Sequence, residues 1–223
     1  MSSEEPGWGE GRAYQDLLLL FSMLLLIIAH PVLDDVPWGQ VLLDLLTFVP
    51  LVLVALRLRR TRVGPWFGAL LLAAFLCWAA SEFLTSPSRA LLALLWGLLT
   101  LAFAVSVVAL FAYLQAAQRV AARHLYAAGS IYLQLVLMFF ALYTAIAALA
   151  PDSFEKTSGG TTSQAVDLLY FSMVTLTTVG YGDIVPVRGL VRMLAGLEAT
   201  MGVMYVAITV AILVGGYRAR TRS

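Results

Sequence analysis

Charged residues are scarce in this chain of 223 residues. Only 12% of its residues are Asp, Glu, Lys or Arg, whereas 61% are hydrophobic. A soluble domain carries about a quarter charged residues. The net charge of +1 gives no electrostatic basis for a nucleic-acid or acidic partner. The composition therefore argues against a soluble globular domain and predicts an integral membrane protein.

Cysteine and clustered histidine are also rare. The single cysteine, Cys77, lies inside an apolar segment, so it cannot form a disulfide within the chain and is expected to be a small buried hydrophobic residue. No Cys–His cluster predicts a metal site, and no group of residues has the pattern of a catalytic constellation. We therefore expect neither a resident cofactor nor enzymatic activity.

Long apolar segments are abundant. A helix needs about 20 residues to span a bilayer, and spanning strands would show alternating polarity, which is absent here. Six segments are candidates for spanning helices: residues 17–32, 41–58, 66–84, 91–114, 127–150 and 191–217. The sequence therefore predicts an all-α polytopic membrane protein with six transmembrane helices.

The basic residues between these segments are divided unequally between the two sides of the membrane. One side carries ten of the 14: Arg12, Arg57, Arg59, Arg60, Arg62, Arg119, Arg123, Arg218, Arg220 and Arg222. Because cytoplasmic loops are enriched in Lys and Arg, both termini are predicted to be cytoplasmic. The location predicted for this multi-pass chain is the cell (plasma) membrane.

The connection between the fifth and sixth segments has a pattern of its own. Residues 164–177 are long enough for a helix of about three turns, too short to span. A glycine-containing strip follows at residues 178–183. Irregular backbone at membrane depth is tolerated only where protein or a water-filled cavity covers it. The pattern therefore predicts a re-entrant pore helix and loop.

The residues of this strip suit a filter for potassium. Rings of backbone carbonyls from four chains can replace the hydration shell of K⁺. Gly180 and Gly182 reach positive φ without steric cost, as a backbone that alternates in hand requires. Thr178 adds a hydroxyl at the inner mouth, while Val179 and Tyr181 are expected to point away and pack behind the strip.

The uninterrupted run from Thr177 to Asp183, preceded by the aromatic pair Tyr170–Phe171, closely resembles the signature of the tetrameric potassium channels. The similarity covers about residues 127–217. It implies a homotetramer with one filter on its four-fold axis. The carbonyls of Thr178, Val179, Gly180 and Tyr181, with the Thr178 hydroxyl, would bind K⁺ as the permeant ion.

The resemblance also assigns roles to residues of the last segment. It implies a hinge at Gly202 and a cavity lined from the same helix. The candidates for the lining are Val203, Val206 and Val210, with Thr209 on the neighbouring stripe.

The chain departs from this family pattern behind the filter. Phe171 has no donor for the Tyr181 hydroxyl, although Tyr170 can still donate to Asp183. Val174 stands where some bacterial members carry a glutamate that pairs with the filter aspartate. Thr177 and Asp183 are the remaining candidates for filter support.

Glu198 is the unusual residue of the last apolar segment, because an acid in a spanning segment is expensive and usually functional. It precedes Gly202 by four residues and so shares its helix face. We hypothesise that Glu198 bonds behind the filter, in place of the support that Val174 cannot give. A protonated, hydrogen-bonded interhelical glutamate without a role in gating is the open alternative.

The first four segments have the plan of a voltage-gated channel but lack its charges. No basic residue occurs between Arg89 and Arg119, whereas a voltage sensor carries several in its fourth helix. Residues 1–124 are thus predicted to form a four-helix domain that does not sense voltage, and residues 125–223 the pore domain. Asp44 is either a proton or cation site or, alternatively, an interfacial or paired acid.

Taken together, these features predict passive, potassium-selective conduction by a homotetramer in lipid, without conventional voltage gating. Two alternatives remain open at this level. In the first, the chain forms a channel that is opened by pH, lipid or tension. In the second, the chain is a transport or signalling subunit that needs a regulatory partner.

Overall fold

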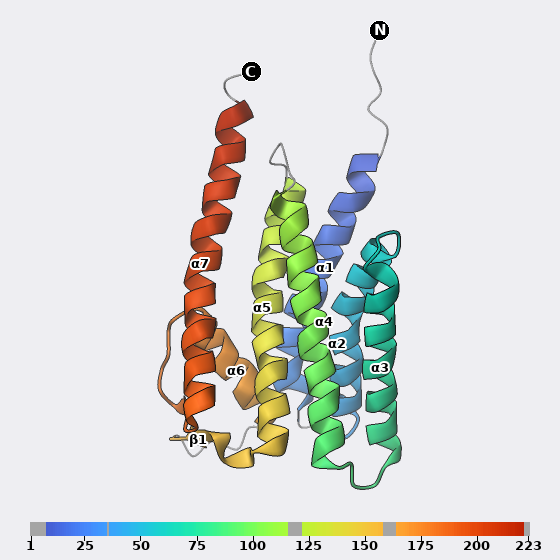
Figure 1. Ribbon diagram of the computed structural model, residues 1–223, viewed down its shortest axis with the longest axis vertical. Helices are drawn as coiled ribbons and strands as arrows, with labels where there is room; N and C mark the ends of the chain where they lie inside the picture. Colours follow the sequence, from blue (N-terminus) through green and yellow to red (C-terminus); the bar gives the residue numbers. More distant parts are fainter. Residues whose placement is uncertain (1–7, 35, 116–121, 158–163, 221–223) are drawn as a thin grey trace.

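The computed structural model describes residues 8–34, 36–115, 122–157 and 164–220 (Figure 1). Within them lie five long helices, then the loop region, then a sixth long helix. The elements are α1 (Trp8–Leu33), α2 (Gly39–Leu58), α3 (Gly64–Phe83), α4 (Arg89–Gln115), α5 (Ala122–Leu149), the 3₁₀ turn η1 (Pro151–Ser153), β1 (Phe154–Lys156), α6 (Gln164–Leu176), β2 (Ile184–Pro186) and α7 (Gly189–Arg220).

The six spanning helices and the short helix expected from the sequence are confirmed. All six long helices, and not α6, are long and apolar enough to cross a membrane. The largest difference in bounds is at α1, which begins at Trp8 rather than near residue 17. Its first turns contain Glu10 and Arg12. Apolar patterning marks only the part of a helix that lies in the bilayer, so such polar turns are missed.

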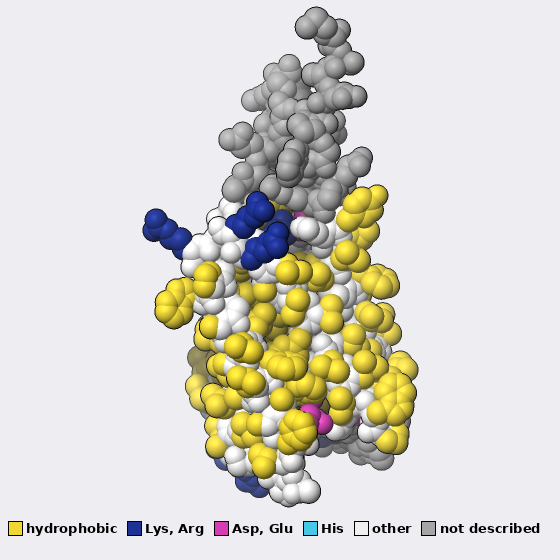
Figure 2. All heavy atoms as spheres, turned by 90° about the vertical axis from the view of Figure 1, so that its right-hand side faces the viewer, with side chains coloured by type: hydrophobic (Ala, Val, Ile, Leu, Met, Phe, Trp, Pro, Cys, Tyr) yellow, Lys and Arg dark blue, Asp and Glu magenta, His cyan; other side chains and the backbone are white. Residues whose placement is uncertain are grey.

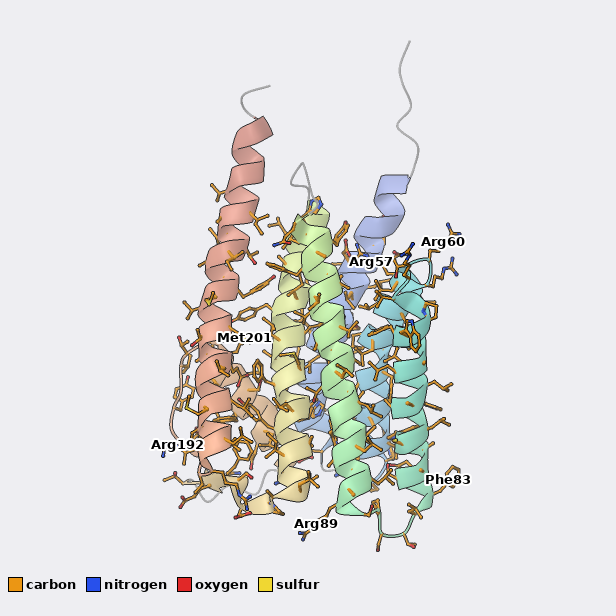
Figure 3. The ribbon with its side chains drawn as sticks, viewed as in Figure 1. Arg57, Arg60, Phe83, Arg89, Arg192 and Met201 are labelled. Atoms are coloured by element: carbon orange, nitrogen blue, oxygen red, sulfur yellow. The ribbon has the colours of Figure 1, made fainter. Side chains whose placement is uncertain are left out.

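The long helices run side by side, and their ends lie at two levels (Figure 1). The start of α1, the end of α7 and the turn between α2 and α3 lie toward one end of the molecule. The α3–α4 connection and β1 lie at the other. Arg57 and Arg60 mark the first end, and Arg89 and Arg192 the second (Figure 3). Arginines therefore flank the apolar body at both ends.

Helix α5 contacts both α4 and α1. On the α4 side, Ser106 Oγ donates to Gln134 Oε1 at 2.7 Å, and Trp96 meets Phe140 edge-to-face at 5.3 Å between ring centroids. On the α1 side, His30 meets the same Phe140 ring at 5.5 Å. Helices α1 and α4 are thus packed directly onto α5.

Polar contacts also join the N-terminal helices to one another. Arg57 of α2 pairs with the fully buried Asp16 of α1 at 2.5 Å, and its guanidinium lies 4.1 Å from the centroid of the Tyr113 ring of α4. Near the opposite end of α2, Trp78 Nε1 donates to Asp44 Oδ2 at 3.1 Å. Asp44 is therefore a paired acid in this structure.

The outer surface over α3 and its neighbours is apolar. Figure 2 shows a continuous field of hydrophobic side chains, with basic side chains toward its rims. The exposed members on α3 include Trp66, Leu72, Leu76 and Phe83. Such a field is the surface that a helix presents to lipid. Cys77 of α3 is a free, half-buried thiol.

Candidate functional site

The short helix α6 ends at the start of the glycine-containing strip and holds it by backbone bonds. The amide of Thr178 donates to the Thr175 carbonyl at 2.9 Å. The amides of Val179 and Gly180 both donate to the Val174 carbonyl, at 2.9 and 3.1 Å. Val174 has no polar side chain, yet its carbonyl fixes the first turn of the strip. The residue type at position 174 does not predict this support, because every residue has a backbone carbonyl.

The strip alternates in backbone hand. Gly180 and Gly182 have φ values of +52° and +78°, and Thr178 has φ +61°. Positive φ is easy for glycine but disfavoured for threonine, so Thr178 is held by the bonds around it. Alternation of this kind lets successive carbonyls face the same side of an extended strip. The side chains of Val179 and Tyr181 are largely exposed in a single chain.

Three groups hold the outer end of the strip at Asp183. Its carboxylate accepts from the Ile184 amide at 3.1 Å and lies close to the Tyr170 hydroxyl. Its backbone carbonyl accepts from the Thr157 amide at 2.8 Å. The ring of Tyr170 also stacks on that of Tyr181, with centroids 6.4 Å apart and planes inclined by 3°. A hydrogen bond from Tyr170 to Asp183, which the sequence suggested, stays a prediction.

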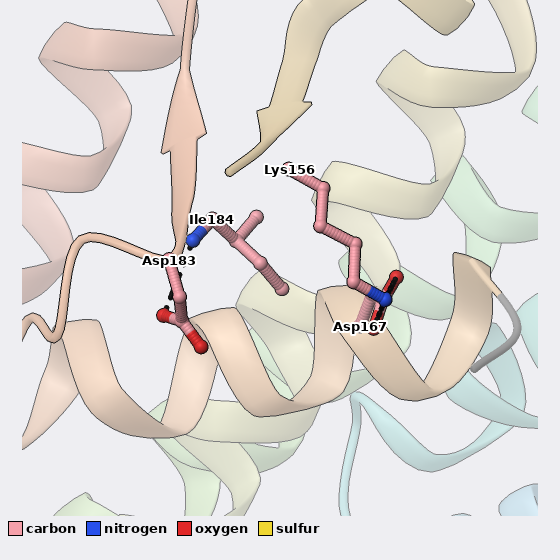
Figure 4. A network of polar contacts seen from close by, with 4 residues as sticks. All are labelled: Lys156, Asp167, Asp183 and Ile184. Carbon is pink, nitrogen blue, oxygen red and sulfur yellow. Dashed lines mark hydrogen bonds and ion pairs between the residues drawn. The ribbon is translucent and has the colours of Figure 1, made fainter. Parts of the chain in front are cut away.

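A two-stranded sheet crosses this outer end. β1 and β2 are antiparallel, with Phe154 opposite Pro186 and Lys156 opposite Ile184. Lys156 Nζ donates to both carboxylate oxygens of Asp167 on α6, at 3.0 and 2.9 Å (Figure 4). The sheet therefore joins the end of the strip to the loop before α6, and the ion pair joins that loop to α6.

A second ion pair lies at the same end and is largely exposed to solvent. Arg188 donates to both oxygens of Asp152, at 2.7 and 2.8 Å. The hydrogen bond from Arg188 lowers the pKa of Asp152 below its ordinary value. The pair is thus ionised at neutral pH, but exposed ion pairs of this kind contribute little to stability.

Glu198 of α7 is fully buried against the other side of α6. Tyr143 of α5 donates to Glu198 Oε2 at 2.7 Å. Ser172 Oγ of α6 lies 2.5 Å from Glu198 Oε1 and 2.9 Å from the carbonyl oxygen of Val136 on α5. Glu198 belongs to none of the ion pairs between described residues. One carboxyl group thus connects three helices.

Phe171 lies apart from the stacked rings of Tyr170 and Tyr181. It is buried, and its ring meets those of Tyr143 and Phe154 edge-to-face, at 5.3 and 5.4 Å between centroids. It therefore packs between α6, α5 and the start of β1, and does not stack with Tyr181 as Tyr170 does.

Gly202 lies where α7 passes the end of α6. A β-carbon at this position would stand 2.0 Å from the carbonyl oxygen of Leu176, so only glycine fits. Helix α7 is continuous through this point. Three turns of its exposed face carry Val203, Val206 and Val210, while Thr209 is buried. Nearby, Tyr205 donates to the Ala128 carbonyl of α5 at 2.6 Å.

The structure thus brings most of the expected site residues around the end of α6. The strip, Tyr170 and Glu198 all lie there, whereas the three valines occupy a different face of α7. Ser172, Tyr143 and Thr157 were missed. The first two are polar groups within apolar segments, which is a usable signal, whereas Thr157 acts only through its backbone amide.

The arrangement defines a class: a membrane protein in which a half-length helix and a filter-like strip are inserted between the last two spanning helices. Residues 131–216 match the family model described as Ion channel (Ion_trans_2). The match covers less than half of the chain, so it shows that this region is similar to the ion channel family.

Parts of the chain are also similar to curated potassium channels. The chain is 50% identical over 64 residues to Two-pore potassium channel 1 of Arabidopsis thaliana, a match of 28% of this chain and 18% of the relative. It is 45% identical over 56 residues to Two pore potassium channel a of Oryza sativa, covering 25% and 16%. It is 31% identical over 85 residues to Potassium voltage-gated channel protein shk-1 of Caenorhabditis elegans, covering 37% and 16%.

These matches span less than a fifth of the length of each relative. No solved structure matches the chain significantly. The comparisons therefore concern the pore region, and the helices α1 to α4 stand outside the family match.

Proposed function

We propose that this chain is the subunit of a potassium-selective channel that conducts K⁺ passively through a tetrameric pore. The observation that carries the proposal is the strip from Thr178 to Gly182, with positive φ at its first, third and fifth residues. In the proposed pore, the carbonyls of Thr178, Val179, Gly180 and Tyr181 and the Thr178 hydroxyl bind the ion. Gly182 supplies the last left-handed step.

The proposal of a homotetramer rests on what one chain leaves uncovered. A ring of carbonyls needs four strips, and each chain carries one. Helix α7 also exposes an apolar face that includes Leu190, Met193, Val203 and Val206. Neighbouring copies would cover part of this face, and the remaining stripe of Val203, Val206 and Val210 would line the inner cavity, with Gly202 as the hinge that the resemblance implies.

The proposed setting is the plasma membrane, with lipid around α3 and both termini in the cytoplasm. The arginines of the α2–α3 turn support this orientation, because basic turns stay on the cytoplasmic side. The filter then opens outward near β1 and β2. The absence of basic residues between Arg89 and Arg119 supports a channel without conventional voltage gating. A channel opened by pH, lipid or tension is the alternative to one that conducts without a stimulus.

The test is the reversal potential of the purified, reconstituted chain in planar bilayers under a K⁺/Na⁺ gradient. We expect reversal near the K⁺ potential and block by Ba²⁺. Gly180→Ala should abolish selective current, because alanine is strained at φ +52°. Gly97→Ala is the matched control: a β-carbon there meets nothing within 4 Å. Reversal at zero, or equal currents in Gly180→Ala and the wild type, would refute the proposal.

A further inference from the structure

We propose that Glu198 is kept as a neutral carboxylic acid and donates its proton to Ser172, so that a chain of hydrogen bonds positions the pore helix from behind. The inference rests on the proposed function for its consequence in the pore. It adds two positioning residues, Tyr143 and Ser172, and it specifies the protonation state of the group between them.

The first argument is a count of hydrogens. Three short contacts meet at this site: Tyr143 Oη to Glu198 Oε2, Glu198 Oε1 to Ser172 Oγ, and Ser172 Oγ to the Val136 carbonyl oxygen. The two hydroxyls supply one hydrogen each, and the carbonyl supplies none. An ionised Glu198 leaves one contact without a hydrogen. A neutral Glu198 supplies the third, and every contact becomes a hydrogen bond.

The donors then follow in one direction. Tyr143 donates to Glu198 Oε2, the acid hydrogen on Oε1 is donated to Ser172 Oγ, and the Ser172 hydroxyl is donated to the Val136 carbonyl. A serine hydroxyl accepts and donates at once, so this order satisfies its geometry. Chains in which each group both accepts and donates strengthen one another in a medium of low dielectric constant.

Burial is the second argument. Glu198 is fully buried on a spanning helix, and it has no cation among its described contacts. A charge removed from water without a partner is strongly disfavoured, and more so within a membrane. Neither hydroxyl carries a charge that would compensate an ionised carboxylate. The neutral acid therefore fits this environment.

The chain of bonds reaches the filter through α6. Ser172 precedes Val174 by two residues, and the Val174 carbonyl accepts the amides of Val179 and Gly180. Helix α6 is thus attached to α5 through Val136 and to α7 through Glu198 close to the point where the filter begins. The position of the C-terminal end of α6 determines where the amides of Val179 and Gly180 lie. Glu198 would therefore act on conduction through α6, without touching the ion.

The protonation state is tested by infrared difference spectroscopy on the reconstituted chain at neutral pH. The wild type minus Glu198→Gln spectrum should contain the carbonyl stretch of a protonated carboxylic acid. Ser172→Ala should shift that band, because the acid loses its acceptor. Asp44→Asn is the control, since it removes another membrane carboxyl and should leave the Glu198 band in place. A carboxylate band in place of the acid band would overturn the proposal.

The positioning role is tested by permeability ratios in planar bilayers. Glu198→Gln keeps a donor for Ser172 and an acceptor for Tyr143, so its K⁺/Na⁺ ratio should stay close to that of the wild type. Glu198→Leu keeps neither the donor nor the acceptor, so the buried hydroxyls of Tyr143 and Ser172 lose their partner. We expect the K⁺/Na⁺ permeability ratio, or the time that the channel spends conducting, to fall about fivefold or more.

The outcomes separate the two proposals. Equal loss in Glu198→Gln and Glu198→Leu would mean that the charge is required, and unchanged conduction in Glu198→Leu would mean that the bonds do not position the filter. Either result overturns the inference while the wild type remains potassium-selective. If Glu198→Leu does not fold, Glu198→Gln and the spectra still decide. A wild type without selective current would instead refute the proposed function.

Discussion

A single glycine, Gly202, sets the distance between α7 and the end of α6. The family resemblance presents this residue as a hinge, a role that stays a proposal. The structure shows another reason for glycine at this position, because the Leu176 carbonyl occupies the space that a side chain would fill. That carbonyl lies one turn or less before the filter, so packing at Gly202 and order in the filter are linked.

Gly202→Ala should therefore impair the pore even if no hinge motion occurs. The methyl group would stand 2.0 Å from a backbone oxygen, and α6 and α7 would have to separate. Overpacking of this kind costs about 1–3 kcal/mol. We expect a lower thermal midpoint in detergent and reduced selective current.

Gly196→Ala on the same helix is the matched control for this substitution. Nothing lies within 4 Å of a β-carbon there. The thermal midpoint in detergent and the selective current should therefore both stay at the wild-type level. A Gly202→Ala variant with wild-type stability and conduction would show that the close approach is relieved at no cost.

At this scale the sequence predicts side chains well and backbone roles poorly. The positive φ of Gly180 and Gly182 follows from their lack of a β-carbon. The positive φ of Thr178 does not follow from its residue type. Neither does the role of the Val174 carbonyl as acceptor of two amides, since every residue has a carbonyl. Glu198 was identifiable because a lone acid in an apolar helix needs partners. Its partners Tyr143 and Ser172 required the packing of three helices.

The short sheet of β1 and β2 is the element that joins the segment after the strip to the segment that follows α5. Thr157, next to β1, donates to the Asp183 carbonyl, and Lys156 within β1 pairs with Asp167 of α6. Both side chains of this pair are only about a quarter exposed, at 26% and 21%. The pair therefore holds β1 against the pore helix more firmly than an exposed pair would.

Breaking the Lys156–Asp167 pair should loosen the outer end of the filter. For Lys156→Met we expect a loss of about 1 kcal/mol in the stability of the conducting state, seen as a shorter conducting time in single-channel records at low external K⁺. The exchanged variant Lys156→Asp with Asp167→Lys should recover part of this loss, because the opposite charges face each other again.

The exposed pair at the same end provides the comparison for this prediction. Arg188→Gln removes the partner of Asp152, whose side chain is 74% exposed, and should leave the conducting time almost unchanged. Equal effects of Lys156→Met and Arg188→Gln would mean that general surface charge, rather than the anchoring of β1, governs the filter exit.

Long elements were predictable from the sequence and short ones were not. Runs of apolar residues identify every spanning helix, and the length of residues 164–177 distinguishes α6 from them. β1 and β2 have three residues each, too few for an alternating pattern. They exist because the chain before α6 and the chain after the filter meet, which is a property of the tertiary structure.

The packing of α1 to α4 on the pore helices is a feature of the whole molecule that composition does not determine. In a bilayer, side chains facing lipid and side chains facing protein are equally apolar, so apolar pattern alone gives no register. Specific contacts come from a few polar pairs, such as Ser106–Gln134 between α4 and α5 and, among the N-terminal helices themselves, Trp78–Asp44. Each residue of these pairs is visible in the sequence, but which residues pair is not.

The whole chain is expected to conduct with weak voltage dependence. One elementary charge that crosses 100 mV gains about 2.3 kcal/mol, and sensors move several such charges. The only basic residue of helix α4 is Arg89, which lies at the end away from the start of α1 (Figure 3). At this end the side chain does not move through the transmembrane potential. Conductance measured against voltage in planar bilayers should therefore vary gently, and Arg89→Gln should give the same curve as the wild type.

A steep curve would contradict this prediction and would point to charge in another helix. Arg57 is the relevant candidate, because Asp16, its partner, is fully buried, and the pair lies where α1, α2 and α4 meet. Arg57→Gln would then flatten the curve. With a gentle curve in the wild type, Arg57→Gln should instead change stability alone, since an ion pair that breaks in place leaves Asp16 buried without its partner.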